Sequence, residues 1–258
     1  MSMKSGAKRT NCKPYNYIYI KIENAMNKTG YFDGIIAIVC LLVSCSPKVS
    51  SNMSVVPSRN ATSDFVYIID PSDEVLEDSN HIGTISITPR FLTTTRKGSF
   101  DKILETAKSH AMKMGGNAIV IVQHTYPDYY KSTHSIKADV FRLPEAYKPI
   151  KENGLKHPEY ASVWFFRYPW MPGCTYNVYL GNELVYWSSA NTKTEVKILE
   201  AGEYVVWAKG EKKVSISIKV EKGHDYYIET NISSGILSPN PALFLVSDYA
   251  GKDACNRM

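Results

Sequence analysis

The spacing of apolar and polar positions in residues 65–143 predicts a small mixed domain. From residue 100 to residue 114, apolar side chains recur at every third or fourth position, which predicts an amphipathic helix. Short runs rich in β-branched and aromatic residues flank this helix on both sides. The four runs are 65–69, 82–87, 117–122 and 135–141. The order strand, strand, helix, strand, strand predicts an α+β domain of ββαββ type.

A different pattern fills residues 159–250. Short β-type runs follow one another at intervals of about ten residues, with Gly-containing turns between them. Within residues 214–220 apolar positions alternate with Ser and Lys, so one face of that strand is expected to be buried and the other wet. This half is therefore predicted to be an antiparallel β-sandwich. Segment 144–158, which contains three prolines and alternating charges, is the predicted linker.

Residues 35–43 form a continuous apolar run of about nine residues, whereas a helix that spans a bilayer needs about 20. A run of this length after a basic residue and before small residues is typical of a secretory signal peptide. The residues at its end, Leu42-Val43-Ser44-Cys45, resemble the bacterial lipobox. The resemblance implies that a diacylglyceryl group is attached to the sulfur of Cys45 and that residues 1–44 are removed. A core helix that ends in Cys is the alternative, which the polar stretch after it disfavours.

The leader is long when counted from Met1, and Met26 offers a second start that gives a leader of ordinary length. Residues 45–64 are rich in Ser and have no sustained apolar period, so they are predicted to be a lipid-anchored tether. The chain is thus expected in the bacterial cell envelope, held to a membrane by its lipid, with the outer membrane as the expected one.

The basic excess of the chain lies in the leader. The formal net charge is +5, from 30 Lys and Arg and 25 Asp and Glu. Residues 1–44 contain six of these basic and two of these acidic side chains, which leaves 24 against 23 in the rest of the chain. The rest therefore offers no excess of positive charge for the capture of nucleic acid. The expected partners are the membrane, through Cys45, and an envelope protein or glycan.

Motifs that carry catalysis are missing from the sequence. It contains no phosphate-binding Gly loop, no Gly-x-Ser-x-Gly elbow, no His-Glu-x-x-His helix and no Cys-x-x-Cys pair. The chain is therefore predicted to have no enzymatic activity and no cofactor. Besides Cys45, the expected mature chain keeps Cys174 and Cys255. The cell envelope permits a disulfide between them, but the sequence does not show whether their Cα atoms lie within the required ~4.4 to 6.8 Å.

A metal site is the alternative function. His124, Asp128 and His134 lie between two strands that are expected to pair, so antiparallel pairing would bring the two imidazoles close together. Two imidazoles and a carboxylate are suitable ligands for zinc or copper. No second pair of ligands lies at a fixed spacing, so a polar hairpin loop is the favoured interpretation.

Tyrosines are concentrated in the same loop. Tyr126, Tyr129 and Tyr130 each combine an apolar ring with a polar tip, so they are predicted to shield a sheet edge or to contact a protein or glycan partner. Residues 164–170 are a second aromatic cluster, which could form a binding platform. Burial of alternate members in the core is the favoured interpretation of that cluster.

Two stretches resemble known envelope proteins. In residues 107–120, spaced Ala residues precede Gly115-Gly116. This pattern resembles that of several small bacterial envelope domains, some of them labelled heavy-metal-binding. It implies that the helix packs closely on the sheet. Four further motifs are Ala161-x-Val163-x-Phe165-x-Arg167, Tyr179-Leu180-Gly181-Asn182, Leu199-x-Ala201-Gly202-x-Tyr204 and Lys222-Gly223-x-x-Tyr226-Tyr227. Through them the second half resembles a family of bacterial lipoprotein β-sandwiches of unknown function, distantly like the PEGA domains. The resemblance implies a fold but no catalytic residue, and Ala201 stands where the family often has Pro.

Overall fold

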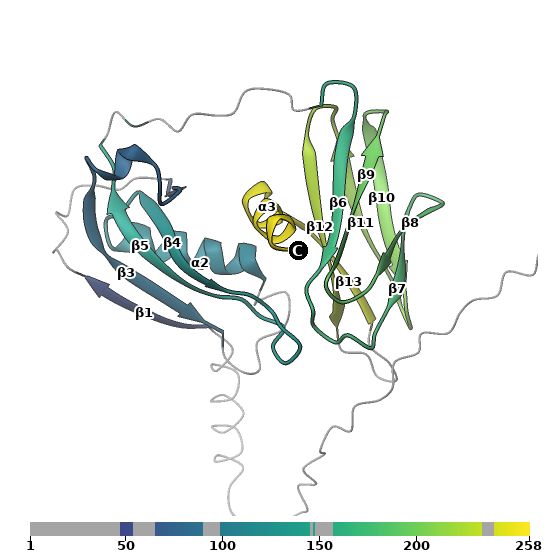
Figure 1. Cartoon of the computed structure of the whole chain (residues 1–258), viewed down its shortest axis with the longest axis horizontal. Helices are drawn as coiled ribbons and strands as arrows, with labels where there is room; N and C mark the ends of the chain where they lie inside the picture. The colour runs from purple at the N-terminus through teal and green to yellow at the C-terminus, as the bar shows by residue number, and fades with distance from the viewer. Residues whose placement is uncertain (1–46, 54–64, 90–98, 145–146, 148–156, 234–239) are drawn as a thin grey trace, which may run out of the picture.

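The computed structural model describes residues 47–53, 65–89, 99–144, 147, 157–233 and 240–258. These residues form a β-rich molecule with three sheets and two α-helices. A five-stranded sheet and one helix make up the part that we call the first lobe, and two four-stranded sheets make up the second lobe (Figure 1). The predicted leader, Cys45 and most of the predicted linker lie outside the described residues.

The sheet of the first lobe has the strand order β1-β3-β5-β4-β2. Its strands are β1 (Lys48–Met53), β2 (Tyr67–Ile68), β3 (Asn80–Thr88), β4 (Ala118–Thr125) and β5 (Ser135–Arg142). β4 and β5 form an antiparallel hairpin, β3 pairs antiparallel with β5, and the short β2 lies parallel to β4. A short 3-10 helix, η1 (Glu74–Leu76), follows β2. Strands β2 to β5 lie at the four β-type runs of the sequence.

The helix α2 (Phe100–Lys113) packs on this sheet because its apolar side chains share one side. The buried ones are Phe100, Ile103, Leu104, Ala107 and Ala111. They form one core with strand residues such as Ile85 and Val140. Gly115 follows the helix with a φ of 84°, a left-handed conformation that Gly adopts without strain. A Cβ on Gly116 would lie 2.3 Å from Cγ1 of Val140, so only Gly allows this close approach to the sheet.

β1 corrects part of the prediction that residues 45–64 form a tether, because residues 48–53 are a strand, while residues 54–64 lie outside the described residues. It pairs antiparallel with β3 along its whole length, beginning with Lys48 opposite Thr88. Hydrophobic spacing does not reveal β1 because it is an edge strand with mostly exposed side chains, of which only Val49 packs against the core. Backbone hydrogen bonds to the edge of β3 hold it in place instead.

The second lobe contains two sheets with the orders β11-β10-β7-β8 and β13-β12-β6-β9. Their strands are β6 (Ala161–Arg167), β7 (Tyr176–Leu180), β8 (Glu183–Ser188), β9 (Thr192–Ile198), β10 (Gly202–Lys209), β11 (Lys213–Val220), β12 (Asp225–Ser233) and β13 (Asn240–Val246). Side chains from both sheets, including Phe165, Val206 and Ile228, join in one buried core. Two sheets that share a core in this way form a sandwich.

The prediction of a wholly antiparallel sandwich is wrong at one strand pair. β6 and β12 run parallel, with Ser162 opposite Asp225 and Phe166 opposite Glu229. The other described pairs of these two sheets are antiparallel. Hydrophobic spacing shows which residues face the core, but it carries no information about the direction of a strand.

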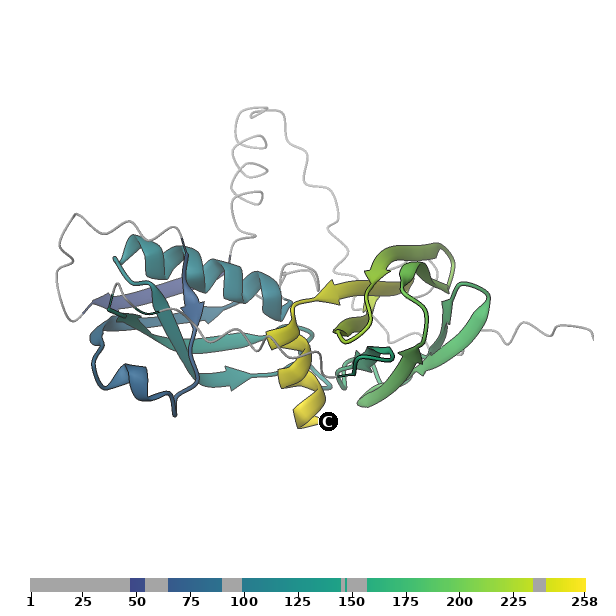
Figure 2. The ribbon, with the colours of Figure 1, turned by 90° about the horizontal axis from the view of Figure 1, so that it is seen from above.

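A helix that the sequence interpretation missed, α3 (Asp248–Arg257), lies between the lobes (Figure 2). Ala250 joins the core of the first lobe, whereas Cys255 packs in a cluster with Tyr227 of the second lobe. A Cβ on Gly251 would lie 2.0 Å from Cγ of Tyr227, so the helix backbone lies directly on that ring. The predicted second unit stops at residue 250 and includes only the start of this helix. The separability of the two predicted units stays a prediction.

Candidate functional site

Four segments converge where the lobes meet: the start of α2, the β4–β5 hairpin, the loop after β6, and α3 (Figure 2). Aromatic, imidazole, guanidinium and carboxylate side chains fill the space between them, and we call this group the junction. Its members are Phe100, His124, Tyr126, His134, Tyr168, Asp253 and Arg257.

His124 and His134 meet inside the junction, as the expected pairing of their strands implies. Nε2 of His124 lies 2.8 Å from Nδ1 of His134, a hydrogen bond across the hairpin. The ring of Phe100 stacks on His124 with 3.9 Å between centroids, and Tyr168 lies edge-on to His134 at 4.8 Å. His134 is 1% exposed. The imidazole pair is therefore enclosed by aromatic rings and shielded from water.

Helix α3 closes the junction through Asp253. Its Oδ1 accepts a hydrogen bond of 2.8 Å from the hydroxyl of Tyr126, and its Oδ2 lies 3.2 Å from Nδ1 of His124. The guanidinium of Arg257 lies 3.8 Å from the centroid of the Tyr126 ring, which is within the range of a cation–π contact. Burial and the Asp253 carboxylate raise the pKa of the Tyr126 hydroxyl, so this hydroxyl stays a hydrogen-bond donor.

Burial governs the protonation of His134. Burial lowers the pKa of His134 well below its usual value, and the neighbouring His124 and Lys131 lower it further. Oδ2 of Asp253 lies 3.2 Å from Nδ1 of His124 but forms no hydrogen bond with a described residue. Nε2 of His134 has no hydrogen-bond partner among the described residues. The neutral form of His134 is therefore favoured inside the junction.

The three residues of the predicted metal site are not brought to one point. Oδ1 of Asp128 accepts hydrogen bonds of 2.8 Å from the backbone N–H groups of Tyr130 and Lys131, so this carboxylate stabilises its own loop. The acidic side chain that does approach His124 is Asp253, and it lies at the nitrogen that faces away from His134. In the part of the chain that the structure describes, no three His, Cys, Asp or Glu side chains form a group that could hold a metal ion.

The three tyrosines of the same loop divide into two kinds. Tyr126 belongs to the junction and is not available as a free contact residue. Tyr129 and Tyr130 are 57% and 92% exposed. The structure therefore leaves Tyr129 and Tyr130 as candidates for contact with a partner.

A buried carboxyl group near the junction escaped the sequence interpretation. Glu229 on β12 is 4% exposed, and its Oε1 accepts a hydrogen bond from the amide of Asn231. Burial raises the pKa of Glu229 to about 7, against the lowering effect of that hydrogen bond, and the nearby carboxylate of Asp101 raises it as well. Glu229 follows Ile228, whose side chain lies in the sandwich core, so it lies on the outer face of its sheet and is buried because other elements cover that face.

An exposed apolar face on the outer side of the sheet β11-β10-β7-β8 was also missed. Trp187 and Leu184 on β8 are 64% and 57% exposed. On the neighbouring strands, the rings of Tyr179 and Trp207 stack with 4.3 Å between centroids, and Nζ of Lys213 lies 4.3 Å from the centroid of the Trp207 ring. Because Tyr179 and Lys213 come from strands on opposite sides of β10, both faces of the Trp207 ring are covered. Trp207 therefore offers no free ring face to a sugar.

The aromatic run 164–170 and the remaining cysteines are mainly structural. Phe165 lies in the sandwich core and Phe166 in the cluster that contacts α3, so burial of members of the run is confirmed, whereas their expected alternation is wrong because both faces of β6 are covered. Cys174 and Cys255 are both buried, form no disulfide with each other, and belong to different clusters. Burial raises the pKa of the Cys255 thiol to about 11, which makes it a poor nucleophile.

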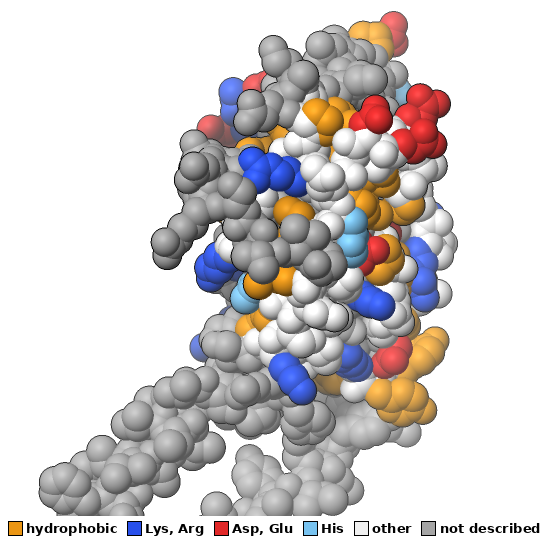
Figure 3. All heavy atoms as spheres, turned by 90° about the vertical axis from the view of Figure 1, so that its left-hand side faces the viewer, with side chains coloured by type: hydrophobic (Ala, Val, Ile, Leu, Met, Phe, Trp, Pro, Cys, Tyr) orange, Lys and Arg blue, Asp and Glu red, His pale blue; other side chains and the backbone are white. Residues whose placement is uncertain are grey.

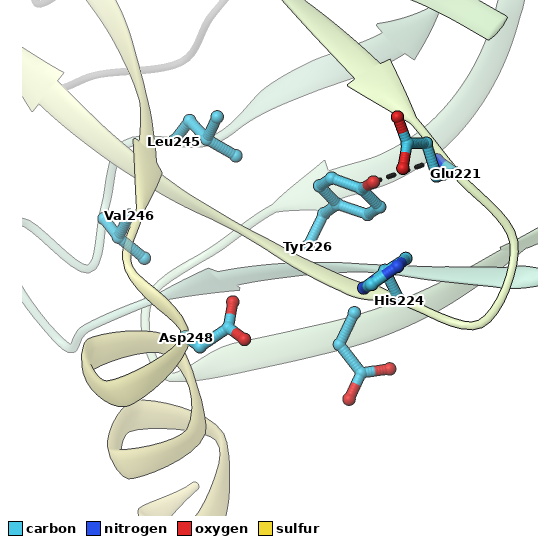
Figure 4. Close-up of a pocket in the computed structure, with 7 residues that line it drawn as sticks. Glu221, His224, Tyr226, Leu245, Val246 and Asp248 are labelled. Atoms are coloured by element: carbon cyan, nitrogen blue, oxygen red, sulfur yellow. Dashed lines mark hydrogen bonds between the residues drawn. The ribbon is translucent and has the colours of Figure 1, made fainter. Parts of the chain in front are cut away.

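A hollow of about 260 Å³ lies where the β11–β12 turn approaches the start of α3 (Figure 4). Its lining residues are Glu221, His224, Asp225, Tyr226, Leu245, Val246 and Asp248. The hydroxyl of Tyr226 accepts a hydrogen bond of 2.9 Å from the backbone N–H of Glu221, which fixes the ring to the turn. Three carboxylates and no Lys or Arg line the hollow, so an anionic ligand is disfavoured there.

The surface of the first lobe shows charges of both signs. Lys and Arg side chains are spread over the face seen in Figure 3, and Asp and Glu side chains gather near one corner of it. This mixture fits the near balance of charge outside the leader and disfavours a polyanionic partner on this face. Among the described helices, none has the length and apolar character that crossing a bilayer requires.

Comparison with protein-family models, with curated proteins and with solved structures returns no match to this chain. The basis for a functional assignment is therefore the chemistry of its own residues.

Proposed function

We propose that the chain is a lipoprotein of the bacterial cell envelope, anchored through a lipid on Cys45, and that it acts as a binding or structural module without catalysis. The observation that carries the proposal is the end of the apolar run, Leu42-Val43-Ser44-Cys45, which resembles the bacterial lipobox. Every element that the structure describes lies after Cys45, and the first of them, β1, starts at Lys48. Removal of residues 1–44 would therefore leave all described elements intact.

The sequence supports the same processing. The apolar run 35–43 has the length of a signal-peptide core, and Leu42-Val43-Ser44-Cys45 resembles the lipobox. A ββαββ unit over residues 65–143 and a PEGA-like sandwich over residues 159–250 belong to this proposal, with β1 as an addition to the first unit and α3 to the second.

Contacts with a partner are assigned to Tyr129 and Tyr130. The loop that carries them is held at two places, by the hydrogen bonds of Asp128 to backbone N–H groups and by the hydrogen bond of Tyr126 to Asp253. A loop fixed in this way displays its exposed rings without the entropic cost of ordering the loop on binding. Aromatic side chains on a preorganised loop are typical anchors of an interface.

Substitution Cys45→Ala tests the anchor. We expect the altered chain to lack the acylated N-terminal peptide and to leave the membrane fraction, because the thiolate that accepts the lipid is gone. Mass spectrometry of the N-terminal peptide and fractionation of the cells measure the two effects. Cys40→Ser, which removes a thiol inside the apolar run, is the matched control and should be acylated normally. A Cys45→Ala chain that stays in the membrane with its leader intact would show that residues 35–43 are an ordinary anchor.

The metal content of the purified chain tests the alternative function, a metal site. Zinc or copper bound in a 1:1 ratio to the purified chain, and lost together with function in His124→Ala and His134→Ala, would replace the proposal of a metal-free binding module. Metal content by mass spectrometry measures this directly.

A further inference from the structure

The proposed lipid anchor and the tip of the β4–β5 hairpin lie at the same end of the first-lobe sheet. β1 begins with Lys48 opposite Thr88, the last residue of β3. β5 begins beside this end of β3, and its first residue, Ser135, pairs with Thr125, the last residue of β4. The start of β1 and the loop between β4 and β5 therefore lie at the same end of the sheet. Figure 1 shows the start of β1 and this loop at the lower end of the first lobe.

The distance available to the anchor is short. Lys48 is the third residue after Cys45, and three residues of extended chain span about 10 Å. Strand β4 is three strand positions away from β1, which corresponds to about 15 Å across the sheet. A lipid on Cys45 would thus hold this end of the sheet, including the hairpin, close to the headgroups, whereas a tether of 20 flexible residues would not.

The chemistry of the hairpin tip suits a membrane surface. Tyr130 is 92% exposed and Tyr129 57% exposed, and tyrosine is enriched at the boundary between lipid and water because its ring is apolar and its tip polar. The carboxylate of Asp128 is engaged with backbone N–H groups of its own loop. The exposed side chains of Lys48 and Lys137 lie near the same end of the sheet, where anionic headgroups attract them.

We propose that Tyr129 and Tyr130 lie in the headgroup region of the membrane that holds the lipid anchor. This inference rests on the proposed lipidation of Cys45 and names the partner of the exposed rings as a lipid surface. The lipid and the hairpin then make a two-point attachment, which fixes the orientation of the first lobe with this end of its sheet toward the bilayer.

Enzymatic iodination of tyrosine tests the proposal, because the iodinating enzyme reaches only rings that face water. The mature lipoprotein is placed in protein-free vesicles of phosphatidylethanolamine and phosphatidylglycerol, and iodination of each tyrosine is followed by peptide mass spectrometry. The matched control carries twelve Gly and Ser residues inserted between Pro47 and Lys48, which keeps the lipid but releases the sheet end from the surface. We expect iodination of Tyr130 to be at least about fivefold slower in the short-tether protein than in the control, because a short tether raises the effective concentration of the hairpin at the bilayer. Tyr249, which is 40% exposed on α3, should react equally in both.

Four outcomes decide the question. Slow iodination of Tyr130 in the short-tether protein alone supports the proposal. Equal iodination in both proteins, with the acylated Cys45 peptide present, overturns the membrane contact and leaves the proposed lipoprotein function standing. Protection of Tyr130 that occurs in native envelopes but not in protein-free vesicles also overturns it, in favour of a protein or glycan partner. Absence of the acylated peptide would instead contradict the proposed function itself.

Discussion

At the scale of single residues, Glu229 makes the stability of the fold depend on pH. Burial raises its pKa to about 7 in the folded chain, whereas the ordinary value for a Glu side chain is 4.5. The protonated form is therefore favoured by folding. The stability associated with this protonation is fully present below pH 4.5 and is lost as the pH rises through 7, because the folded chain must then bury a charged carboxylate.

Substitution Glu229→Gln should remove this penalty. We expect the free energy of unfolding to rise at pH 8 by roughly 1 to 3 kcal/mol and to change little at pH 4.5, since Gln resembles the protonated carboxyl group. Urea denaturation at the two pH values measures the difference. The lowered pKa of His134 has the opposite effect, because it reduces the free energy of unfolding as the pH falls below 6.5. Both the parent and the Glu229→Gln chain contain His134, so this effect cancels in the comparison.

The exposed Glu203 provides a control for the loss of a charge. Glu203→Gln removes a carboxylate from the same lobe without relieving any burial, so its effect should be small and similar at both pH values. A Glu229→Gln chain that is less stable than the parent at pH 8 would show that the carboxylate has a compensating partner.

At the scale of elements, the sequence predicts what hydrophobic spacing encodes and misses the rest. The α2 helix and strands β3 to β5 carry a clear apolar period, and they occur where that period places them. β1 has no such period because an exposed edge strand is held by backbone hydrogen bonds. The C-terminal helix was missed because its buried side consists of Ala250, Gly251, Ala254 and Cys255, which are small and give little apolar contrast.

The candidate site shows the same division. The approach of His124 to His134 follows from the pairing of β4 with β5, so the sequence predicts it. Asp253, the carboxylate that approaches His124, is 119 positions away from His134 in the chain and comes from a helix that was not predicted. Local spacing therefore finds pairs within one hairpin, whereas contacts between distant elements require the packed structure.

Substitution Gly251→Ala tests how closely α3 must lie on the second lobe. The added methyl group would meet the ring of Tyr227 at 2.0 Å, so the helix must move away. We expect a loss of about 1 to 3 kcal/mol in the free energy of unfolding, together with faster amide hydrogen exchange in α3. Lys252→Ala is the control, because it changes the neighbouring residue on the same helix without adding atoms at the contact. Unchanged exchange in Gly251→Ala would mean that the contact with Tyr227 does not position the helix.

At the scale of the whole molecule, α3 connects two lobes that the sequence predicts to be separate. Its Ala250 packs in the first-lobe core, and the side chain of Asp101 on α2 accepts a hydrogen bond of 2.9 Å from the backbone N–H of Ser247. Near its other end, Cys255 packs with Phe166 and Tyr227 of the second lobe. The relative position of the lobes therefore depends on this helix as well as on the linker.

Limited proteolysis tests whether the two lobes stay together after the linker between them is cut. The Pro-, Lys- and Gly-containing segment 148–156 joins two units that each have their own apolar core, so trypsin should cut there before it cuts inside either unit. The two fragments should nevertheless elute together in size-exclusion chromatography, because α3 and the junction hold them. In the Gly251→Ala chain the same cleavage should yield fragments that separate more readily, since the displaced helix loses contact with the second lobe. If the fragments of the parent chain separate at once, the junction contributes little to the association of the lobes. If trypsin cuts inside a lobe first, the two units are not independent folding units.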